Sequence, residues 1–161
     1  HNPQSNLKLA SGIAPIPAML KRGITVGLGT DGTSSNNNLD LLEECRLTAM
    51  LHKGISGDPL LIPAKEALEL ATKQGALALG FTDIGQIAVG QKADIVLYDM
   101  QKPYWYPRHD RISLLVYAAN ATDADTVIVN GKILMKNGKL LHMDVEKIYA
   151  EANTRGHRLT K

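Results

Sequence analysis

Several structural classes are excluded by what this sequence lacks. Its 161 residues contain a single cysteine, Cys45, so no disulfide can form within the chain. No stretch approaches the roughly 18 consecutive apolar residues of a membrane-spanning helix, and the first residues lack the basic and apolar regions of a signal peptide. The 18 basic and 16 acidic residues are scattered, without the block of like charge that a nucleic-acid-binding arm would show. We therefore expect neither nucleic acid nor membrane as a partner, and a reducing cytoplasm fits the single cysteine.

The remaining composition is that of a globular protein. Apolar residues make up 44% of the chain, enough to fill the core of one ordinary domain or two small ones. The chain opens at His1 rather than at methionine. A cleaved precursor, an expression boundary or a piece of a longer chain would each explain this opening.

The first 80 residues have the pattern of an α/β fold. Helices are predicted where apolar residues recur every three or four positions, with proline near the start and glycine at the end. Residues 13–22, residues 39–53 after an Asn38 N-cap, and residues 63–79 fit this description. Residues 24–28 form a β-branched run bounded by glycines, typical of a buried strand in a parallel sheet.

After Gly80 the apolar period shortens toward two, which predicts strands. The expected strands cover residues 86–89, 94–98, 126–129, 132–135 and 139–141. Asn-Gly pairs separate the last three, and Asn-Gly favours tight hairpins because both central residues need a positive φ. A meander over residues 126–141 and a closing helix over residues 144–154 should follow. The PYWYP segment at 103–107 is expected to be irregular and to pack its rings against a neighbour, with ligand binding as the alternative.

Asp31 is the side chain best placed for chemistry. It lies three residues after the predicted strand, in the loop GTDGTSSNN. In parallel α/β folds functional groups gather at the carboxyl ends of strands, because the loops converge there. A carboxylate in this place could bind a metal ion or act as a base. A turn residue or a helix cap is the alternative, since turns favour Gly, Asp, Ser and Asn.

The other reactive side chains do not form a recognisable site. The five histidines include no H-x-H or i,i+4 pair, whereas a zinc site needs three or four ligands. His52, near a helix end, is expected to be partly exposed. Cys45 lies on the helix face predicted to point inward, so we expect an inert core residue. Ser34 and Ser35 lack the setting of a catalytic serine, but a hydroxyl contact to a substrate stays open.

Three longer motifs resemble a known family. HNPQSNLKLASGIAPI at residues 1–16, VGLGTDGTSSNNNLDLLEE at 26–44 and GQIAVGQKADIVLYD at 85–99 are similar to the C-terminal part of the amidohydrolase superfamily. Within it, the chain most resembles the 5-methylthioadenosine/S-adenosylhomocysteine deaminases, which also resemble the chlorohydrolases and guanine deaminases. The resemblance covers essentially the whole chain. It implies an aminohydrolase, which hydrolyses a C–N bond to remove the amino group of an adenine nucleoside.

The resemblance also implies a fold and a site. HNPQSN would lie at the end of the seventh strand of a (β/α)8 barrel, residues 24–28 would be the eighth strand, and residues 85–99 would return to a small β-sandwich. Asp31 would be both a metal ligand and the catalytic acceptor of a proton from the metal-bound water. The divalent metal would be zinc, with iron as the alternative. Ser35 would contact the purine nucleoside, and His1 would line the pocket without binding the metal.

The resemblance divides the chain into three parts and leaves it incomplete. Residues 1–80 would be the last strands and helices of the barrel, 81–143 part of the β-sandwich, and 144–161 a C-terminal helix and tail. A (β/α)8 barrel needs about 250 residues, and this sequence holds neither the family's other metal ligands nor its catalytic glutamate. We therefore expect the chain alone to be inactive and to need the N-terminal part of the barrel as its partner. Assembly into a homo-oligomer is a further expectation. The rival hypotheses are a guanine deaminase, a triazine chlorohydrolase, and a non-catalytic fragment acting as an assembly module.

Overall fold

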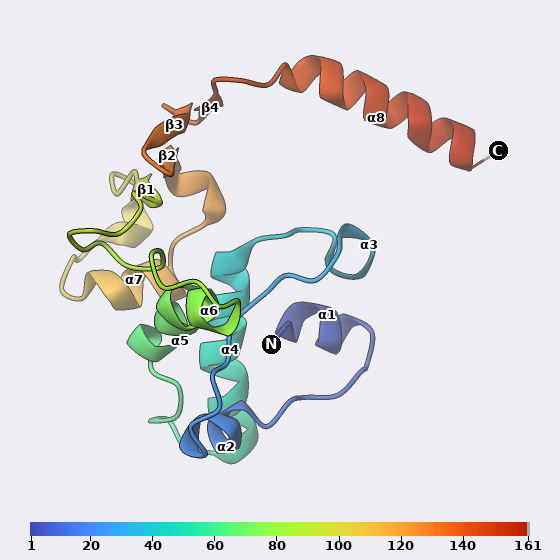
Figure 1. Ribbon diagram of the computed structural model, residues 1–161. Coiled ribbons are helices and arrows are strands. Elements are labelled where there is room, and N and C mark those ends of the chain that lie inside the picture. Colours follow the sequence, from blue (N-terminus) through green and yellow to red (C-terminus); the bar gives the residue numbers. More distant parts are fainter. Residues whose placement is uncertain (161) are drawn as a thin grey trace.

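The computed structural model describes residues 1–160, which form a helical part and a small antiparallel sheet (Figure 1). The helices are α1 (Pro3–Lys8), α2 (Ile16–Lys21), α3 (Thr33–Asn36), α4 (Leu41–Ser56), α5 (Ala64–Ala71), α6 (Lys73–Ala78), α7 (Arg111–Tyr117) and α8 (Val145–Leu159), with the 3₁₀ turns η1 (Pro103–Trp105) and η2 (Ala121–Asp123). The strands are β1 (Ile95–Tyr98), β2 (Ala124–Val129), β3 (Lys132–Lys136) and β4 (Lys139–Leu140). They lie in the order β1-β2-β3-β4, each antiparallel to its neighbour.

The main core lies where α4 packs against α5. Ala49 and Ala67 are fully buried there, and such small side chains let the two helices approach closely. Cys45 lies in the same core with its Sγ 3.8 Å from the carbonyl oxygen of Ala67. Cys45 is 1% exposed, so the prediction of a core cysteine is confirmed, and burial raises the pKa of its thiol to about 12, which disfavours the reactive thiolate.

Helix α4 begins and ends later than its sequence pattern predicts. Its N-cap is Asp40 rather than Asn38, because Asp40 has extended backbone angles and its carboxylate accepts from the N–H groups of Leu42 and Glu43. The helix continues through Gly54 to Ser56. It ends there because Gly57 adopts the left-handed conformation, with φ at 70°.

The predicted strand at residues 24–28 is wrong in this structure. The segment is extended, but it joins no ladder within residues 1–160, and a strand requires a hydrogen-bonded neighbour. Leu28 instead donates its N–H to the carbonyl oxygen of Leu70 at 3.1 Å. Residues 86–89 are not a strand either, and Val89 is fully exposed.

The predicted helix over residues 63–79 is divided into α5 and α6. The break is at Thr72, where φ is −121° and ψ is −96°. Gly85 packs into this break, and a Cβ at Gly85 would come within 3.0 Å of the Thr72 carbonyl oxygen and of Ala76. The close approach of the following loop therefore coincides with the interruption of the helix.

The meander prediction is confirmed. Asn130 and Gly131 have φ values of 47° and 77°, and Asn137 and Gly138 have values of 51° and 70°. These positive angles belong to the tight turns that join β2 to β3 and β3 to β4. Strand β1 pairs with β2 and leaves its other edge open in the described residues.

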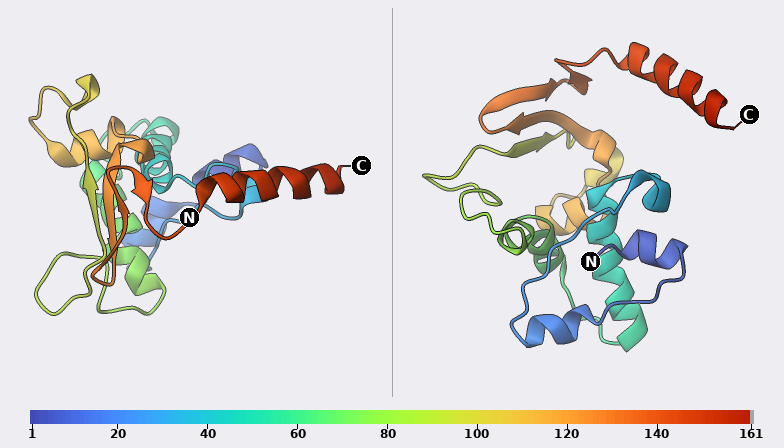
Figure 2. Two further views of the ribbon diagram at one scale, coloured as in Figure 1. Left: turned by 90° about the horizontal axis from the view of Figure 1, so that it is seen from above. Right: turned by 45° about the vertical axis from the view of Figure 1, so that its right-hand side comes forward.

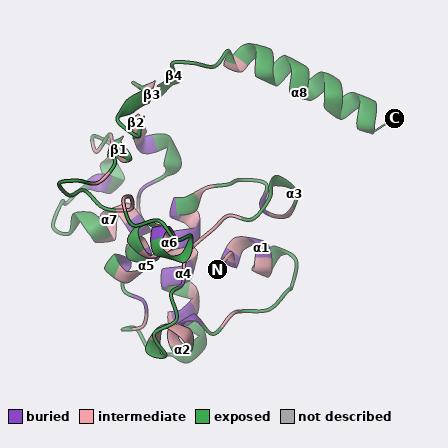
Figure 3. Cartoon of the chain, in the orientation of Figure 1, coloured by how far each residue is buried: buried purple, intermediate pink, exposed green. Residues whose placement is uncertain are grey.

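Helix α8 projects away from the rest of the molecule. Its N-cap is Asp144, as its sequence pattern predicts, and it runs to Leu159 rather than ending near residue 154. It contains no buried residue; Figure 2 shows it extended away from the sheet, and Figure 3 colours it as exposed after its first residue. None of the helices within residues 1–160 is both long and apolar enough to cross a membrane.

Candidate functional site around Asp31

Asp31 lies in a loop between the extended segment 24–28 and helix α3. Its φ is 62°, a left-handed conformation that aspartate adopts more readily than most residues other than glycine. Gly32 follows as the N-cap residue of α3. The Asp31 side chain is exposed, so an ion or a substrate can reach its carboxylate.

Both oxygens of the Asp31 carboxylate accept a hydrogen bond. Ser5 donates its hydroxyl to Oδ2 at 2.7 Å, and Gly32 donates its N–H to Oδ1 at 2.7 Å. The hydroxyls of Ser35 and Ser5, together with the Gly32 N–H, hold the pKa of Asp31 below its ordinary value. Asp31 is therefore ionised at neutral pH, which is the state that a metal ligand or a general base requires.

Ser35 stands next to this carboxylate on α3. It is half-buried, and its single hydroxyl proton is donated to the carbonyl oxygen of Gly32 at 3.0 Å or, after rotation of the hydroxyl, to the Asp31 carboxylate. Asp31 and Ser35, both singled out from the sequence, thus lie four residues apart, with Ser35 on the helix that follows the Asp31 loop.

The HNPQSN motif holds the Asp31 loop from the opposite side. Gly29 donates its N–H to the carbonyl oxygen of His1 at 3.1 Å. A Cβ at Gly29 would come within 3.1 Å of the Asn2 side chain, so the two segments are in close contact. With its amide nitrogen turned toward the loop, Asn2 donates to the Gly29 carbonyl oxygen at 3.2 Å. Together with the Ser5 bond, these contacts bind the start of α1 to residues 29–31.

Glu44 joins α1, α3 and α4 beneath the loop. It is fully buried, accepting the Gln4 N–H at 3.1 Å and the Asn36 amide at 2.7 Å. Asn36 in turn accepts the N–H groups of Asn38 and Leu39 at 3.0 and 2.9 Å. Burial raises the pKa of Glu44, and the donors from Gln4 and Asn36 only partly oppose that effect. Glu44 thereby fixes the path of the chain after Asp31.

His1 lies against α4. Its ring centroid is 5.5 Å from that of His52, with the two planes tilted by 41°. His52 is only 5% exposed, so the prediction of a partly exposed residue is wrong, because α1 packs over that face of α4. Burial lowers the pKa of His52. The structure thus places His1 beside a buried histidine, and its role as a pocket residue stays a prediction.

The described residues fit only part of a metal site. Among residues 1–160, no three His, Cys, Asp or Glu side chains gather closely enough to hold an ion. The Asp31 carboxylate has the right chemistry for one ligand of a divalent ion, and further ligands would have to come from elsewhere.

An apolar groove lies next to this loop, with Asn2 and Gly29 in its lining. It has a volume of about 820 Å³, runs between the α5–α6 region and β1, and does not include Asp31. Its lining is mostly apolar and includes Leu28, Leu68, Leu79, Ile87, Val96 and Leu115. Nucleoside sites also need convergent polar groups, and few polar side chains line this groove. Its chemistry resembles an uncovered packing surface more than a catalytic pocket.

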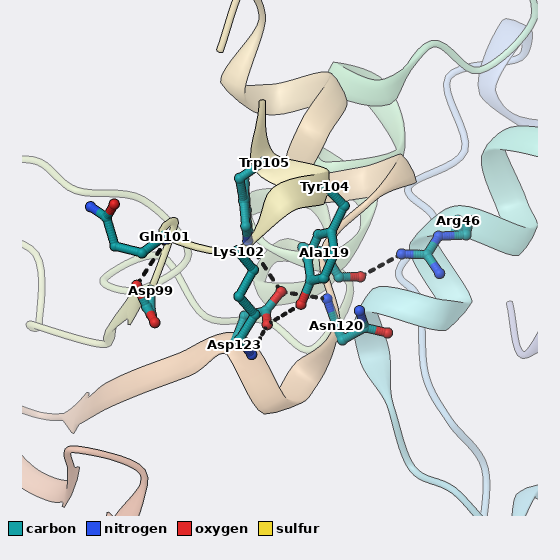
Figure 4. Close-up of polar contacts among 9 residues, drawn as sticks. All are labelled: Arg46, Asp99, Gln101, Lys102, Tyr104, Trp105, Ala119, Asn120 and Asp123. Carbon is teal, nitrogen blue, oxygen red and sulfur yellow. Dashed lines mark hydrogen bonds and ion pairs between the residues drawn. The ribbon is translucent and has the colours of Figure 1, made fainter. Parts of the chain in front are cut away.

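A second polar cluster surrounds Asp123 (Figure 4). The Asp123 side chain is completely buried, and it accepts from the Tyr104 hydroxyl at 2.6 Å, the Trp105 indole at 3.2 Å and the Asn120 N–H at 3.0 Å. Lys102 forms an ion pair with the same carboxylate. Trp105 is 2% exposed, as expected for a ring packed against a neighbour. Because every oxygen of Asp123 is engaged, we assign this cluster a structural role.

Sequence reasoning missed the residues that support the site. Ser5 lies inside a quoted motif, but its bond to Asp31 spans 26 positions and has no local signature. The same holds for Glu44, whose partner Gln4 is 40 positions away. Asp123 does carry a signal, since Asn120 and Asp123 have the spacing of a capping box.

Comparisons with known proteins give a consistent family. Residues 1–134 match the sequence pattern of the Amidohydrolase family. A 5-methylthioadenosine/S-adenosylhomocysteine deaminase from Dictyoglomus thermophilum is 56% identical over 161 residues, which are 100% of this chain and 38% of the relative. The chain therefore spans well under half the length of this curated relative.

Two solved structures share the arrangement of this chain. An adenosine deaminase from Xanthomonas campestris with bound zinc is 39% identical with a TM-score of 0.96, over 99% of this chain and 37% of the other. An atrazine chlorohydrolase from Arthrobacter aurescens, complexed with zinc, is 33% identical with a TM-score of 0.88, over 96% of this chain and 34% of the other.

Proposed function

This chain belongs to the amidohydrolase family, and from that premise we propose that it is the C-terminal part of a longer, metal-dependent enzyme that deaminates an adenine nucleoside by hydrolysis. The substrate would be of the 5-methylthioadenosine/S-adenosylhomocysteine type. The observation that carries the proposal is the Asp31 loop, where an ionised, accessible carboxylate accepts hydrogen bonds from Ser5 on α1 and from the adjacent Gly32 N–H. The name and the 56% identity of the Dictyoglomus relative support the substrate class.

Asp31 has two roles in this proposal. One carboxylate oxygen would bind a divalent ion, which, when bound, makes water more acidic and so easier to activate. The carboxylate would also accept the proton that the attacking water gives up and pass it to the departing amino group. The overall reaction consumes one water, replaces the ring C–NH₂ bond by C=O and releases ammonia. The zinc in both solved structures supports zinc as the metal, with iron as the alternative.

Ser35 and His1 would serve the substrate rather than the metal. The Ser35 hydroxyl lies on α3, directly after the loop that carries Asp31, and would contact a molecule held there. His1 would line the pocket through the ring that packs against His52.

The proposal also accounts for the large uncovered surfaces. We propose that residues 1–80 complete a (β/α)8 barrel, that residues 81–143 belong to a small β-sandwich, and that residues 144–161 are a C-terminal helix and tail. The N-terminal part of the barrel would then supply the remaining metal ligands and cover the apolar groove and the open edge of β1. The match to the Xanthomonas structure supports this, because 99% of this chain keeps its arrangement within a protein of which it matches only 37%. We propose a reducing cytoplasm as the location of the enzyme and a homo-oligomer as one form of its assembly.

A chlorohydrolase is the second candidate. The Arthrobacter structure favours it, with 33% identity and a TM-score of 0.88, but the Xanthomonas deaminase exceeds it in both. A guanine deaminase and a non-catalytic assembly module are further alternatives that the same assay separates.

The test is a substrate panel with an Asp31 variant. The full-length protein that contains these residues is incubated with zinc and with methylthioadenosine, S-adenosylhomocysteine, guanine or atrazine. We expect ammonia from the two nucleosides, and a loss of about 10²–10⁴-fold in kcat for Asp31→Ala, the size of a lost acid–base group. Asp58→Ala, at an exposed aspartate after α4, is the control and should act like the wild type. Retained deamination by Asp31→Ala would refute the role of Asp31. Activity only on atrazine or guanine would show that the proposed substrate class is wrong.

A further inference from the structure

We propose that Ser5 is a positioning residue, whose hydroxyl orients the Asp31 carboxylate toward the metal and the substrate. The proposal rests on the proposed function and adds a residue to it. It starts from a single bond, between the Ser5 Oγ and the Asp31 Oδ2, of 2.7 Å.

The hydrogen bonds to Asp31 leave lone pairs of its carboxylate free for a metal ion and for a proton. An ionised carboxylate has about four lone-pair directions. Ser5 occupies one on Oδ2 and the Gly32 N–H occupies one on Oδ1. With the Ser35 hydroxyl turned to the Gly32 carbonyl oxygen, two directions remain, one to bind an ion and one to accept a proton.

Ser5 is the donor that ties Asp31 to a different part of the fold. Gly32 is the next residue in the chain, so its N–H moves together with the loop. Ser5 lies 26 positions away on α1. Asp31 is exposed and on a left-handed backbone, so no packing of its own side chain fixes its rotamer. Without Ser5 the carboxylate would be held only by groups within four residues of Asp31, the Gly32 N–H and the Ser35 hydroxyl.

The position of Ser5 is itself well fixed. Ser5 is 2% exposed, and Pro3 before it is also buried. The N–H of Gln4 bonds to the buried Glu44 on α4, which joins α1 to the main core. A buried hydroxyl on a fixed helix can hold an exposed ligand in one orientation, and partners of this kind contribute to metal affinity.

The test compares three serine variants in the full-length protein. Zinc affinity is measured by competition with a chromogenic chelator, and kcat and KM are measured with methylthioadenosine. For Ser5→Ala we expect zinc affinity to fall about 10- to 100-fold, and kcat at saturating zinc to fall with KM nearly unchanged. Ser5→Thr keeps a hydroxyl and should recover most of both losses. Ser11→Ala, at an exposed serine just after α1, is the matched control and should equal the wild type.

The outcomes separate this proposal from the function on which it rests. If the wild type binds zinc and deaminates, and Ser5→Ala does both equally well, the Ser5 proposal is overturned alone. If Ser5→Thr is as impaired as Ser5→Ala, the effect is one of packing and the proposal also fails. If Ser5→Ala weakens zinc binding but the wild type does not deaminate, the Ser5 role stands and the substrate is wrong. A wild type that binds neither zinc nor iron overturns both.

Discussion

Replacing Asp123 with asparagine tests whether the Asp123 cluster is structural. The substitution keeps the shape of the side chain but turns one acceptor oxygen into a donor. At present Lys102 and Tyr104 bond to Oδ1, and Trp105 and the Asn120 N–H bond to Oδ2. The new NH₂ group must face one of these pairs.

The cost follows from which pair is displaced. If the NH₂ group faces Trp105, a buried indole N–H loses its acceptor, which costs about 1–3 kcal/mol. If it faces Lys102 and Tyr104, the Lys102 bond is lost and the Tyr104 hydroxyl must turn to accept instead of donate, but both partners can reach water. The ion pair with a buried charge is removed in either case. We therefore expect the free energy of unfolding to fall by about 2–4 kcal/mol at pH 7.

The stability difference between wild type and Asp123→Asn should depend on pH in one direction. Burial alone would raise the pKa of Asp123, but Lys102, Tyr104 and the Asn120 N–H outweigh it and bring the pKa to about 2, below its ordinary value of 3.8. A carboxyl with a lowered folded-state pKa stabilises the protein above its unfolded-state pKa. The difference between wild type and Asp123→Asn should therefore be constant from pH 7 to 5 and shrink between pH 4 and 2.

The assay is urea unfolding of the full-length protein and its variants across this pH range. Asp99→Asn is the control, because Asp99 is exposed and accepts only the Gln101 N–H among the contacts of Figure 4. It should change stability by no more than about 0.5 kcal/mol. The reasoning is refuted if Asp123→Asn behaves like this control, or if its deficit persists unchanged at pH 3.

Two further substitutions test contacts that support the fold. Glu44→Gln should lower the free energy of unfolding by about 1–3 kcal/mol, because one of the two donors to the buried carboxylate would face an NH₂ group. Urea unfolding measures this loss, and an equal loss for Glu151→Gln on exposed α8 would contradict the prediction. Gly85→Ala should destabilise more than Gly90→Ala in thermal unfolding, by about 1–3 kcal/mol. Both glycines have a positive φ, but only a Cβ at Gly85 meets backbone at 3.0 Å, so equal losses would show that the packing into the α5–α6 break is unimportant.

Local signals made parts of this fold predictable. The Asn-Gly turns need only their own two residues, and their positive φ values agree with the prediction. Helices α4 and α8 could be predicted from the spacing of their apolar residues. The bounds of α4 could not, because they depend on Asp40 as the N-cap and Gly57 as the C-cap.

The errors came from contacts distant in sequence. Residues 24–28 have a strand's composition, but a strand also needs a neighbour, which the described residues do not offer. The break at Thr72 involves Gly85, thirteen positions later, and periodicity cannot register that contact. In the site, Asp31 could be singled out from its position and its motif. Ser5 and Glu44 could not, since their importance lies in partners 26 and 40 positions away.

The burial of Cys45 gives the helical core a built-in chemical reporter. Cys45 is 1% exposed, and burial raises the pKa of its thiol to about 12. In the folded state alkylating reagents therefore cannot reach the sulfur, and the sulfur is not in the reactive thiolate form. Modification requires α4 and α5 to separate, and its rate follows how often they do. Mass spectrometry of the peptide that carries Cys45 would thus measure the opening free energy of this one region, even within a longer protein.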